Sequence, residues 1–329
     1  MLGIEAVCRL SKAISVAPAS CDIAWSQTGV TCGIGAALAA ARLMQLDLGS
    51  ARMAAGIAAA GASGIRALHG SMCTAALPAF AGQSGLRAAL LARGGFTATQ
   101  SVIEARYGLA QCFALTPHLA YLTDGLGTDW EAAKVGFKMY PNVTSIHAAL
   151  DAMRATGVAA RDIQSIEIGV GHMTFVHTAW DYRPAGVTAA QMNMFYGIAV
   201  MALRGDVTAR DYTEARITDP ETLAFIPRIK VFEDGELEAM GAAFRHAARV
   251  TVHTTDGRTI KREVLNRRGS PESPVTREDV ERKFSANLAG ILGGKEIEQL
   301  KTLALGLDTL ANADAILRIV GAGSDAAGQ

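Results

Sequence analysis

The sequence predicts an α+β protein in which a mostly helical domain, built from both ends of the chain, is interrupted by a smaller α+β lid domain with an antiparallel sheet. Ala, Leu, Met and Arg dominate residues 1–134, and helical patterns return after residue 276. Between them lie short runs that alternate apolar and polar residues. We therefore expect a helical domain at 1–134 and 266–320, a lid domain at 135–265 and a disordered tail at 321–329. The last helices should pack on the first.

The strand prediction for the lid domain rests on three segments. Apolar side chains alternate with Glu and Gly over residues 166–170, and a second strand is expected over residues 227–232. The clearest signal covers residues 250–264, where two alternating runs flank Asp256-Gly257. This dipeptide is typical of a type I′ turn, so a β-hairpin is expected there.

The composition restricts the class of protein. The 329 residues are 50% hydrophobic and 19% charged, with no net charge and no basic stripe, so we expect no nucleic-acid partner. Residues 23–41 and 67–86 lack charge, but their Ala and Gly content favours buried helices over membrane spans. The odd number of scattered cysteines predicts reduced, buried thiols and a cytoplasmic location. These cysteines are Cys8, Cys21, Cys32, Cys73 and Cys112.

Common cofactor and metal motifs are weak in this sequence. Gly33-Ile34-Gly35 lacks the third glycine of a dinucleotide fingerprint and follows no convincing strand, so helix packing is the better interpretation. His172, His177 and His253 have no spacing typical of zinc ligands. No phosphate-binding loop and no nucleophile elbow is present. We expect neither a cofactor nor a metal.

One short run at the expected domain boundary stands out as a candidate site. Lys138-Met139-Tyr140-Pro141 is followed by His147, just where the helical pattern gives way to the lid domain. A lysine in a cleft between domains can act as a base or bind an anion. From spacing alone, a surface lysine beside a turn is the simpler interpretation.

The same run begins a resemblance that extends along nearly the whole chain. Residues 137–141 and 145–152 resemble K-x-Y-P and T-H-x-A-I-D-A of the MmgE/PrpD family, which includes 2-methylcitrate dehydratase, cis-aconitate decarboxylase and iminodisuccinate epimerase. Residues 56–66 and 86–97 look like its G-I-A-A-S-Q-A-S-G-L-R and L-L-A-A-L-L-A-x-x-G-F-T. Arg183-Pro184 with Tyr196, and residues 268–287, resemble R-P … Y-x-V-A and R-G-x-P-E-N-P … K-F-x-x-N. The resemblance implies the same two-domain fold and a homodimer that acts on small di- or tricarboxylic acids.

The sequence also departs from the family pattern. The family's G-S-M-T-K-P-L-H-P-G-R-A-A aligns with residues 70–81, so its lysine, histidine and arginine become Thr74, Leu77 and Phe80. Arg66-Ala67-Leu68-His69 imitates K-P-L-H but lies outside that register. A further family histidine, in G-W-H-P-T, is Ser26 here. The chain also begins partway into the family's helical domain, so we expect the upstream segment, which carries an Asp, a Thr and a His of the active site, to be lacking.

The resemblance leaves Lys138 and Tyr196 as candidate catalytic residues. Arg183 and His147 match family positions and are candidates for substrate binding, as are Ser26 and Thr74 at replaced positions. Removing a proton or a carboxylate beside another carboxylate builds up negative charge, which requires a tuned base and fixed positive charge. Lys138 suits either role.

Three functions remain open from the sequence. The first is a lyase that abstracts a proton next to a carboxylate of a small di- or tricarboxylic acid. The second is an epimerase or isomerase that uses Lys138 and Tyr196 on opposite faces of one carbon. The third is a non-catalytic, dimerising remnant of the family.

Overall fold

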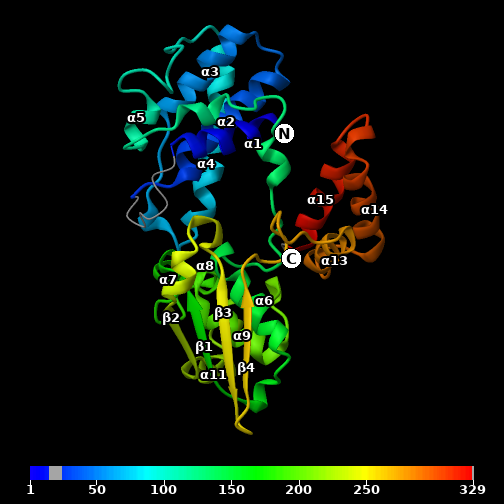
Figure 1. Ribbon diagram of the computed structural model, residues 1–329. Helices are drawn as coiled ribbons and strands as arrows, with labels where there is room; N and C mark the ends of the chain where they lie inside the picture. The colour runs from blue at the N-terminus through cyan, green and yellow to red at the C-terminus, as the bar shows by residue number, and fades with distance from the viewer. Residues whose placement is uncertain (15–23, 328–329) are drawn as a thin grey trace.

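The N-terminal part of the chain forms a helical domain in the computed structural model, which describes residues 1–14 and 24–327 (Figure 1). Its helices are α1 (Leu2–Ala13), α2 (Gln27–Leu43), α3 (Leu48–Ala60), α4 (Cys73–Arg93) and α5 (Leu109–Phe113). Helix α2 packs against α1, α3 and α4. A β-carbon on Gly85 would lie 2.3 Å from the carbonyl oxygen of Gly33, so these glycines let α2 and α4 approach closely. Gly33-Ile34-Gly35 therefore serves helix packing.

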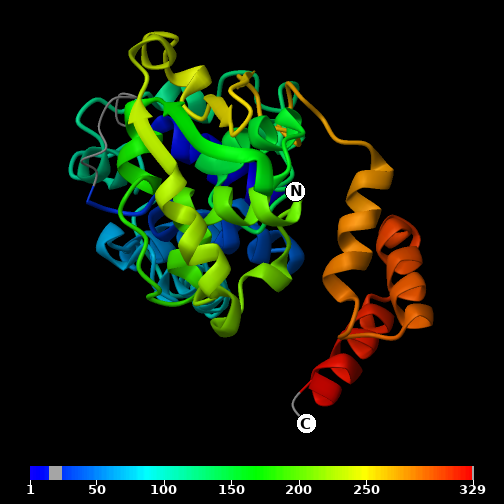
Figure 2. The same ribbon diagram turned by 90° about the horizontal axis from the view of Figure 1, so that it is seen from below.

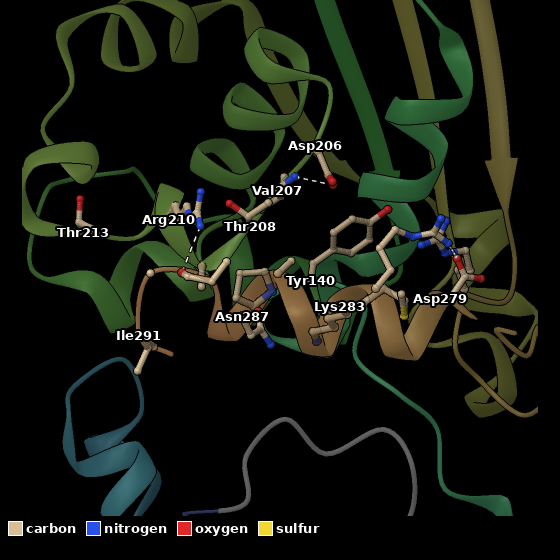
Figure 3. A pocket seen from close by; sticks show the side chains of 18 of the residues that line it. Tyr140, Asp206, Val207, Thr208, Arg210, Thr213, Asp279, Lys283, Asn287 and Ile291 are labelled. Carbon is tan, nitrogen blue, oxygen red and sulfur yellow. Dashed lines mark hydrogen bonds and ion pairs between the residues drawn. The ribbon is translucent and has the colours of Figure 1, made fainter. Parts of the chain in front are cut away.

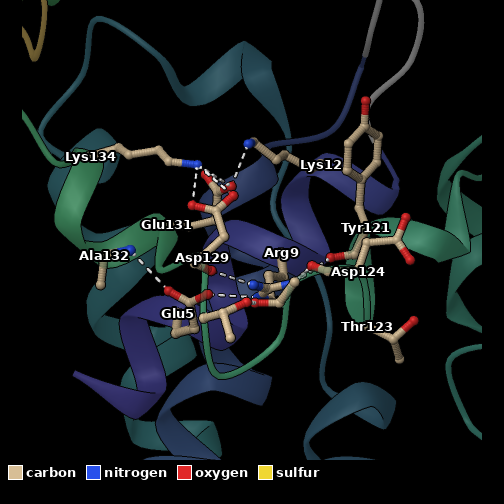
Figure 4. A network of polar contacts seen from close by, with 12 residues as sticks. Glu5, Arg9, Lys12, Tyr121, Thr123, Asp124, Asp129, Glu131, Ala132 and Lys134 are labelled. Atoms are coloured by element: carbon tan, nitrogen blue, oxygen red, sulfur yellow. Dashed lines mark hydrogen bonds and ion pairs between the residues drawn. The ribbon is translucent and has the colours of Figure 1, made fainter.

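A buried polar network ties α1 to the segment that leads out of the helical domain (Figure 4). The Arg9 guanidinium contacts the Glu5 carboxylate at 2.6 Å and donates to the carbonyls of Asp124 and Asp129 at 2.7 and 2.6 Å. The second Glu5 oxygen accepts the Ala132 N–H at 2.9 Å. Burial acts to raise the pKa of Glu5, but the hydrogen bonds from Ala132 and Arg9 lower it below its ordinary value. This network fixes the chain shortly before Lys138.

The middle of the chain forms a separate α+β domain with its own apolar core, which shares no residue with the core of the helical domain. Its strands are β1 (Ile163–Val170), β2 (Ile229–Glu233), β3 (Ala248–Thr254) and β4 (Thr259–Val264). Its helices are α6 (His147–Thr156), α7 (His172–Thr178), α8 (Val187–Met192), α9 (Met194–Arg204), α10 (Glu214–Ile217), α11 (Pro220–Phe225) and α12 (Gly235–Ala239). The predicted α+β class is confirmed.

The sheet is mixed, which corrects the expectation of an antiparallel sheet. Its order is β2-β1-β3-β4, and β1 pairs antiparallel with β3 but parallel with β2. Parallel neighbours require a long crossover, and helices α7 to α11 supply it. Along β3 the buried residues alternate with partly exposed ones, and α6 and α9 cover the buried face. The sheet thus keeps one face toward solvent.

The β3–β4 hairpin lies where the alternating runs predicted it, but its turn differs from the type I′ expectation. Four residues, 255–258, connect the strands, and only Gly257 has a positive φ, of 84°. A type I′ turn needs positive φ at both central residues. The Asp256 carboxylate instead accepts a hydrogen bond from the Thr254 hydroxyl and closes the loop through its side chain.

The C-terminal helices differ most from expectation. Helices α13 (Arg277–Leu288), α14 (Gly294–Leu305) and α15 (Asp314–Ala327) pack in sequence on one another, and Figure 2 shows them as a group beside the rest of the chain rather than on the first helices. None of the described side chains of α13 is buried, and its charges form ion pairs along the helix. It therefore has no apolar stripe to dock on the helical domain.

The expected disorder from residue 321 is wrong as far as Ala327. Helix α15 continues through Gly321 to Ala327, with Ala, the strongest helix former, recurring near its end. No helix within residues 1–14 and 24–327 is both long and apolar enough to cross a bilayer.

The predicted cysteine environment is only partly correct. Cys8 and Cys32 are half-buried, and burial raises the pKa of both thiols. Cys73 and Cys112 are exposed, so the expectation of burial is wrong for these two. Cys21 lies outside the described residues.

Candidate functional site

Lys138 lies in a segment that residues 267–269, distant in the sequence, hold in place. The N–H of Phe137 donates to the carbonyl of Gly269 at 2.7 Å, and the Arg267 guanidinium donates to the carbonyl of Phe137 at 2.9 Å. Gly269 has a φ of 88°, and a β-carbon there would lie 2.3 Å from the Phe137 oxygen. Glycine is therefore required for this close approach.

Tyr140 fixes the other side of the same segment. Its hydroxyl donates to one oxygen of Asp151 at 2.7 Å, and the other oxygen accepts the N–H of Arg268 at 2.8 Å. Burial and the Asp151 charge raise the pKa of Tyr140 above its ordinary value, so the hydroxyl stays protonated as a donor.

Lys138 itself has cationic neighbours. The residue as a whole is exposed, but packing around its side chain removes enough water that desolvation lowers its pKa, and the charges of Arg267 and Lys283 lower it further. The Lys283 ammonium donates to the Lys138 carbonyl, so α13 reaches this point. Both neighbours favour the neutral amine that a lysine base requires.

His147 is fully buried at the start of α6. Its Nε2 contacts the carbonyl oxygen of Asn142 at 3.2 Å, and its ring packs edge-on against Tyr140. A carbonyl can only accept, so Nε2 carries the proton and Nδ1 presents a lone pair. Burial, opposed only in part by the Asn142 carbonyl, lowers the pKa of His147 to about 3, and Arg267 and Lys138 act in the same direction. His147 is therefore neutral across the physiological range.

The helical domain meets the α+β domain through a second group of polar residues. The Arg66 guanidinium lies 3.1 Å from Nε2 of His177 in α7, and the rings of His69 and His177 are 6.3 Å apart. Desolvation lowers the pKa of His69 and of His177, and the Arg66 charge adds to both shifts. The Thr74 hydroxyl donates to the carbonyl of Leu68 at 3.2 Å, so it closes the loop that carries His69.

His246 connects these two groups. It precedes β3, and desolvation followed by the charges of Arg245 and Arg267 lowers its pKa to about 4. The charge of His177 also contributes to that shift, so the histidine group and the Lys138 group lie within electrostatic range of one another. We call the whole set the seam cluster. It comprises Arg66, His69, Lys138, His147, His177, His246, Arg267 and Lys283.

The structure places Tyr196 in the interior of the α+β domain rather than beside Lys138. Its side chain is fully buried, its ring stacks on Tyr182 at 5.0 Å, and its hydroxyl donates to the carbonyl of Asp211 at 2.6 Å. Burial raises its pKa to about 12. We therefore assign Tyr196 a structural role, which corrects its expected place as a catalytic partner of Lys138.

The other predicted binding residues do not join Lys138 directly. Arg183 is exposed and makes no hydrogen bond or ion pair within the described residues. It belongs to the segment between α7 and α8, two helices at the end of the α+β domain nearest the helical domain (Figure 1). Ser26 is buried as the residue before α2, and its hydroxyl lies 2.9 Å from that of Thr28. Of these residues, only Arg183 has its polar group free for a ligand.

A pocket of about 1010 Å³ adjoins the seam cluster between α13 and the α+β domain (Figure 3). Tyr140 and Lys283 line it and connect it to the Lys138 segment. Several of its charged side chains are already engaged, as in the contact between Arg154 and Asp206 and the hydrogen bond from Arg210 to the carbonyl of Ala289. Lys283 therefore belongs both to the wall of this pocket and to the seam cluster.

Metal binding receives no support from the described residues, which contain no group of three His, Cys, Asp or Glu side chains placed to hold an ion. His172 contacts Glu233 at 3.0 Å, while His253 lies on the sheet beside Thr259. His177 belongs to the seam cluster. The three histidines therefore lie in different parts of the domain and do not converge on one site.

Sequence reasoning found Lys138 and His147 but missed most of the seam cluster. Four of the seven histidines, His69, His147, His177 and His246, gather there. The run Arg66-Ala67-Leu68-His69 carries a signal for part of it, because it is similar to K-P-L-H although it lies outside the family register.

Comparison with known proteins identifies the class of protein. The MmgE/PrpD N-terminal domain matches residues 1–121, and the MmgE/PrpD C-terminal domain matches residues 139–309. The chain therefore belongs to the MmgE/PrpD family, as its motifs predicted. Lys138 immediately precedes the C-terminal match, and helices α13 and α14 fall within it.

Three relatives with curated names are distant from this chain. The chain is 24% identical over 315 residues to the cis-aconitate decarboxylase-like protein oryM of Aspergillus oryzae, covering 90% of this chain and 65% of the relative. It is 24% identical to cis-aconitate decarboxylase of Aspergillus terreus, covering 97% and 69%, and 22% identical to that of Homo sapiens, covering 87% and 61%. The chain thus spans about two thirds of these relatives' lengths.

Proposed function

We propose that this protein is a lyase that removes a proton from a carbon next to a carboxylate in a small di- or tricarboxylic acid. The observation that carries the proposal is the environment of Lys138, where desolvation and the charges of Arg267 and Lys283 lower the pKa. Family membership and relatives named as cis-aconitate decarboxylases support the lyase class.

The residues suggest distinct roles in such a reaction. The neutral Lys138 amine accepts the proton, and the electron pair left on carbon delocalises into the adjacent carboxylate. Arg267 and Lys283 supply fixed positive charge where that negative charge develops. The pair then returns to form a double bond as the leaving group on the next carbon departs with its own bonding electrons. His147 offers its Nδ1 lone pair to a substrate hydroxyl.

The epimerase alternative, with Lys138 and Tyr196 as two opposed bases, has lost its second base because the Tyr196 hydroxyl is bound to the Asp211 carbonyl in the interior. The non-catalytic alternative is decided by activity. Proton removal by the wild type would exclude the non-catalytic alternative, whereas inversion of the substrate without an unsaturated product would favour the epimerase over the lyase.

Deuterium exchange tests the proposal. The full chain is incubated in D₂O with a panel of C4–C6 di- and tricarboxylates, and exchange at the carbon next to the carboxylate is followed by NMR. We expect Lys138→Met to abolish exchange, whereas Lys261→Met on exposed β4 is the matched control and leaves it unchanged. The rate should rise with pH to a midpoint below 10.5, the ordinary lysine pKa. Absence of exchange in the wild type on every acid of the panel would contradict the proposal.

We also propose that the protein works as a homodimer. Leu305, Leu307 and Val320, in and beside the group of C-terminal helices, are about half exposed or more against the described part of the chain. Sedimentation of the full chain at micromolar concentration should give twice the mass of one chain, and a purely monomeric species would contradict this proposal.

A further inference from the structure

Three histidines of the seam cluster have a buried ring nitrogen that makes no hydrogen bond to any residue of 1–14 or 24–327. These atoms are Nδ1 of His147, His177 and His246, and each is shielded from solvent. Buried polar atoms nearly always have a partner, so each orphaned atom requires an explanation. A ligand bound at the seam would supply the missing partners and is one such explanation.

The neighbours of each ring decide whether its free nitrogen is a donor or an acceptor. An arginine can only donate, so Nε2 of His177 accepts from Arg66 at 3.1 Å, and Nε2 of His246 accepts from Arg245 at 3.3 Å. The proton of each neutral ring then belongs to Nδ1. His177 and His246 therefore present Nδ1–H donors, in contrast to His147, which presents a lone pair.

Both donors are connected to the Lys138 group. Arg267 donates to the carbonyl of Phe137 beside Lys138, and its charge acts on His246 together with that of His177. Arg66 contributes positive charge from the helical domain. N–H donors surrounded by arginines suit an anion with two oxygen acceptors, which is the chemistry of a carboxylate.

The geometry points to a second carboxylate subsite, in which the Nδ1–H groups of His177 and His246 bind the carboxylate of the substrate that lies farther from Lys138. This inference rests on the proposed function and deepens it, because it names the residues that make the site select dicarboxylates over monocarboxylates. The arginines lock both tautomers, so the donors remain in place while the rings stay uncharged.

A pair of acids that differ by one carboxylate tests the subsite. Calorimetry measures the affinity of the full chain for succinate and for butyrate, which share a four-carbon chain. We expect His177→Leu and His246→Leu each to weaken succinate binding about tenfold and to leave butyrate binding within about twofold. His177→Asn should retain most of the succinate affinity, since its amide can donate from nearly the position of Nδ1. His253→Leu on the sheet is the matched control.

Nitrogen NMR of ¹⁵N-histidine-labelled wild type gives a measurement that does not depend on any variant folding. His177 and His246 should appear as Nδ1–H tautomers, and succinate should shift both Nδ1 signals. An Nε2–H tautomer at either residue, or Nδ1 signals unmoved by saturating succinate, would overturn the subsite, as would unchanged succinate affinity in both Leu variants.

The two proposals fail in different ways. If the wild type exchanges substrate protons but the Leu variants bind succinate normally, the subsite is wrong and the lyase proposal stands. If histidine-dependent succinate binding occurs without exchange on any acid, the subsite stands and the lyase proposal is wrong.

Discussion

Replacing His147 with Gln should make the protein less sensitive to mild acid. A glutamine amide can still donate to the Asn142 carbonyl, as Nε2 does now at 3.2 Å, but it does not titrate. The substitution therefore removes one proton-binding group from the interior and keeps its hydrogen bond.

The magnitude follows from the pKa of His147, which burial lowers from 6.5 to about 3. Between these values the unfolded chain binds a proton at this residue and the folded chain does not, so the free energy of unfolding falls as the pH falls. The slope is about 1.4 kcal/mol per pH unit for one proton. Between pH 6.5 and pH 5, this residue should therefore lower the free energy of unfolding by about 2 kcal/mol. Above pH 6.5 the residue is neutral in both states and the loss disappears.

Urea denaturation at pH 7, 6 and 5 measures this difference. The wild type should lose about 2 kcal/mol more than His147→Gln over this range, whereas His253→Gln on the solvent-facing side of β3 should follow the wild type. His246 contributes a similar slope in both proteins and cancels in the comparison. Parallel pH dependence of wild type and His147→Gln would refute the argument that His147 is buried in its neutral form.

Three further substitutions test how the site is held together. Tyr196→Phe should cost about 1 kcal/mol in urea denaturation and leave proton exchange intact; lost exchange in a folded variant would restore its catalytic role. Gly269→Ala should displace Phe137 and reduce exchange, with a stability loss of at least 1–3 kcal/mol from strain. Gly257→Ala, also at positive φ but with open space around it, should leave exchange unchanged. Arg9→Met should lower the free energy of unfolding by roughly 3 kcal/mol in urea, because the buried Glu5 carboxylate loses its cation and three backbone carbonyls lose a charged donor; a change below 1 kcal/mol would contradict this.

Local patterns predicted the parts of the fold that depend on neighbouring residues. Alternation located the β3–β4 hairpin. Pairing between distant segments left no local trace, so the parallel β1–β2 contact across residues 171–228 could not be predicted. The position of α13 to α15 depends on tertiary packing in the same way.

The candidate site also combines residues that local motifs predict with residues that only tertiary contacts bring to it. Lys138 and His147 carry motif signals, whereas Arg267 reaches the Phe137 carbonyl from 130 positions away and His246 matches no motif. Tyr196 matched a motif, yet its hydroxyl bonds a carbonyl in the interior. A motif match fixes the position of a residue in the sequence, but the partners of its polar atoms decide its role.

Positive charge at the base of the helical domain has a different source from that in the family pattern. In the family register, Thr74 and Leu77 stand where the pattern has lysine and histidine, and Leu77 is buried in α4. Arg66 and His69 lie in the preceding loop, which the Thr74 hydroxyl closes, and they face His177 across the seam. A cation and an imidazole therefore still meet the α+β domain here, but from the loop before α4 instead of from the helix. Because Arg66 also sets the His177 tautomer, the loop before α4 determines that His177 presents an N–H donor on the α+β side.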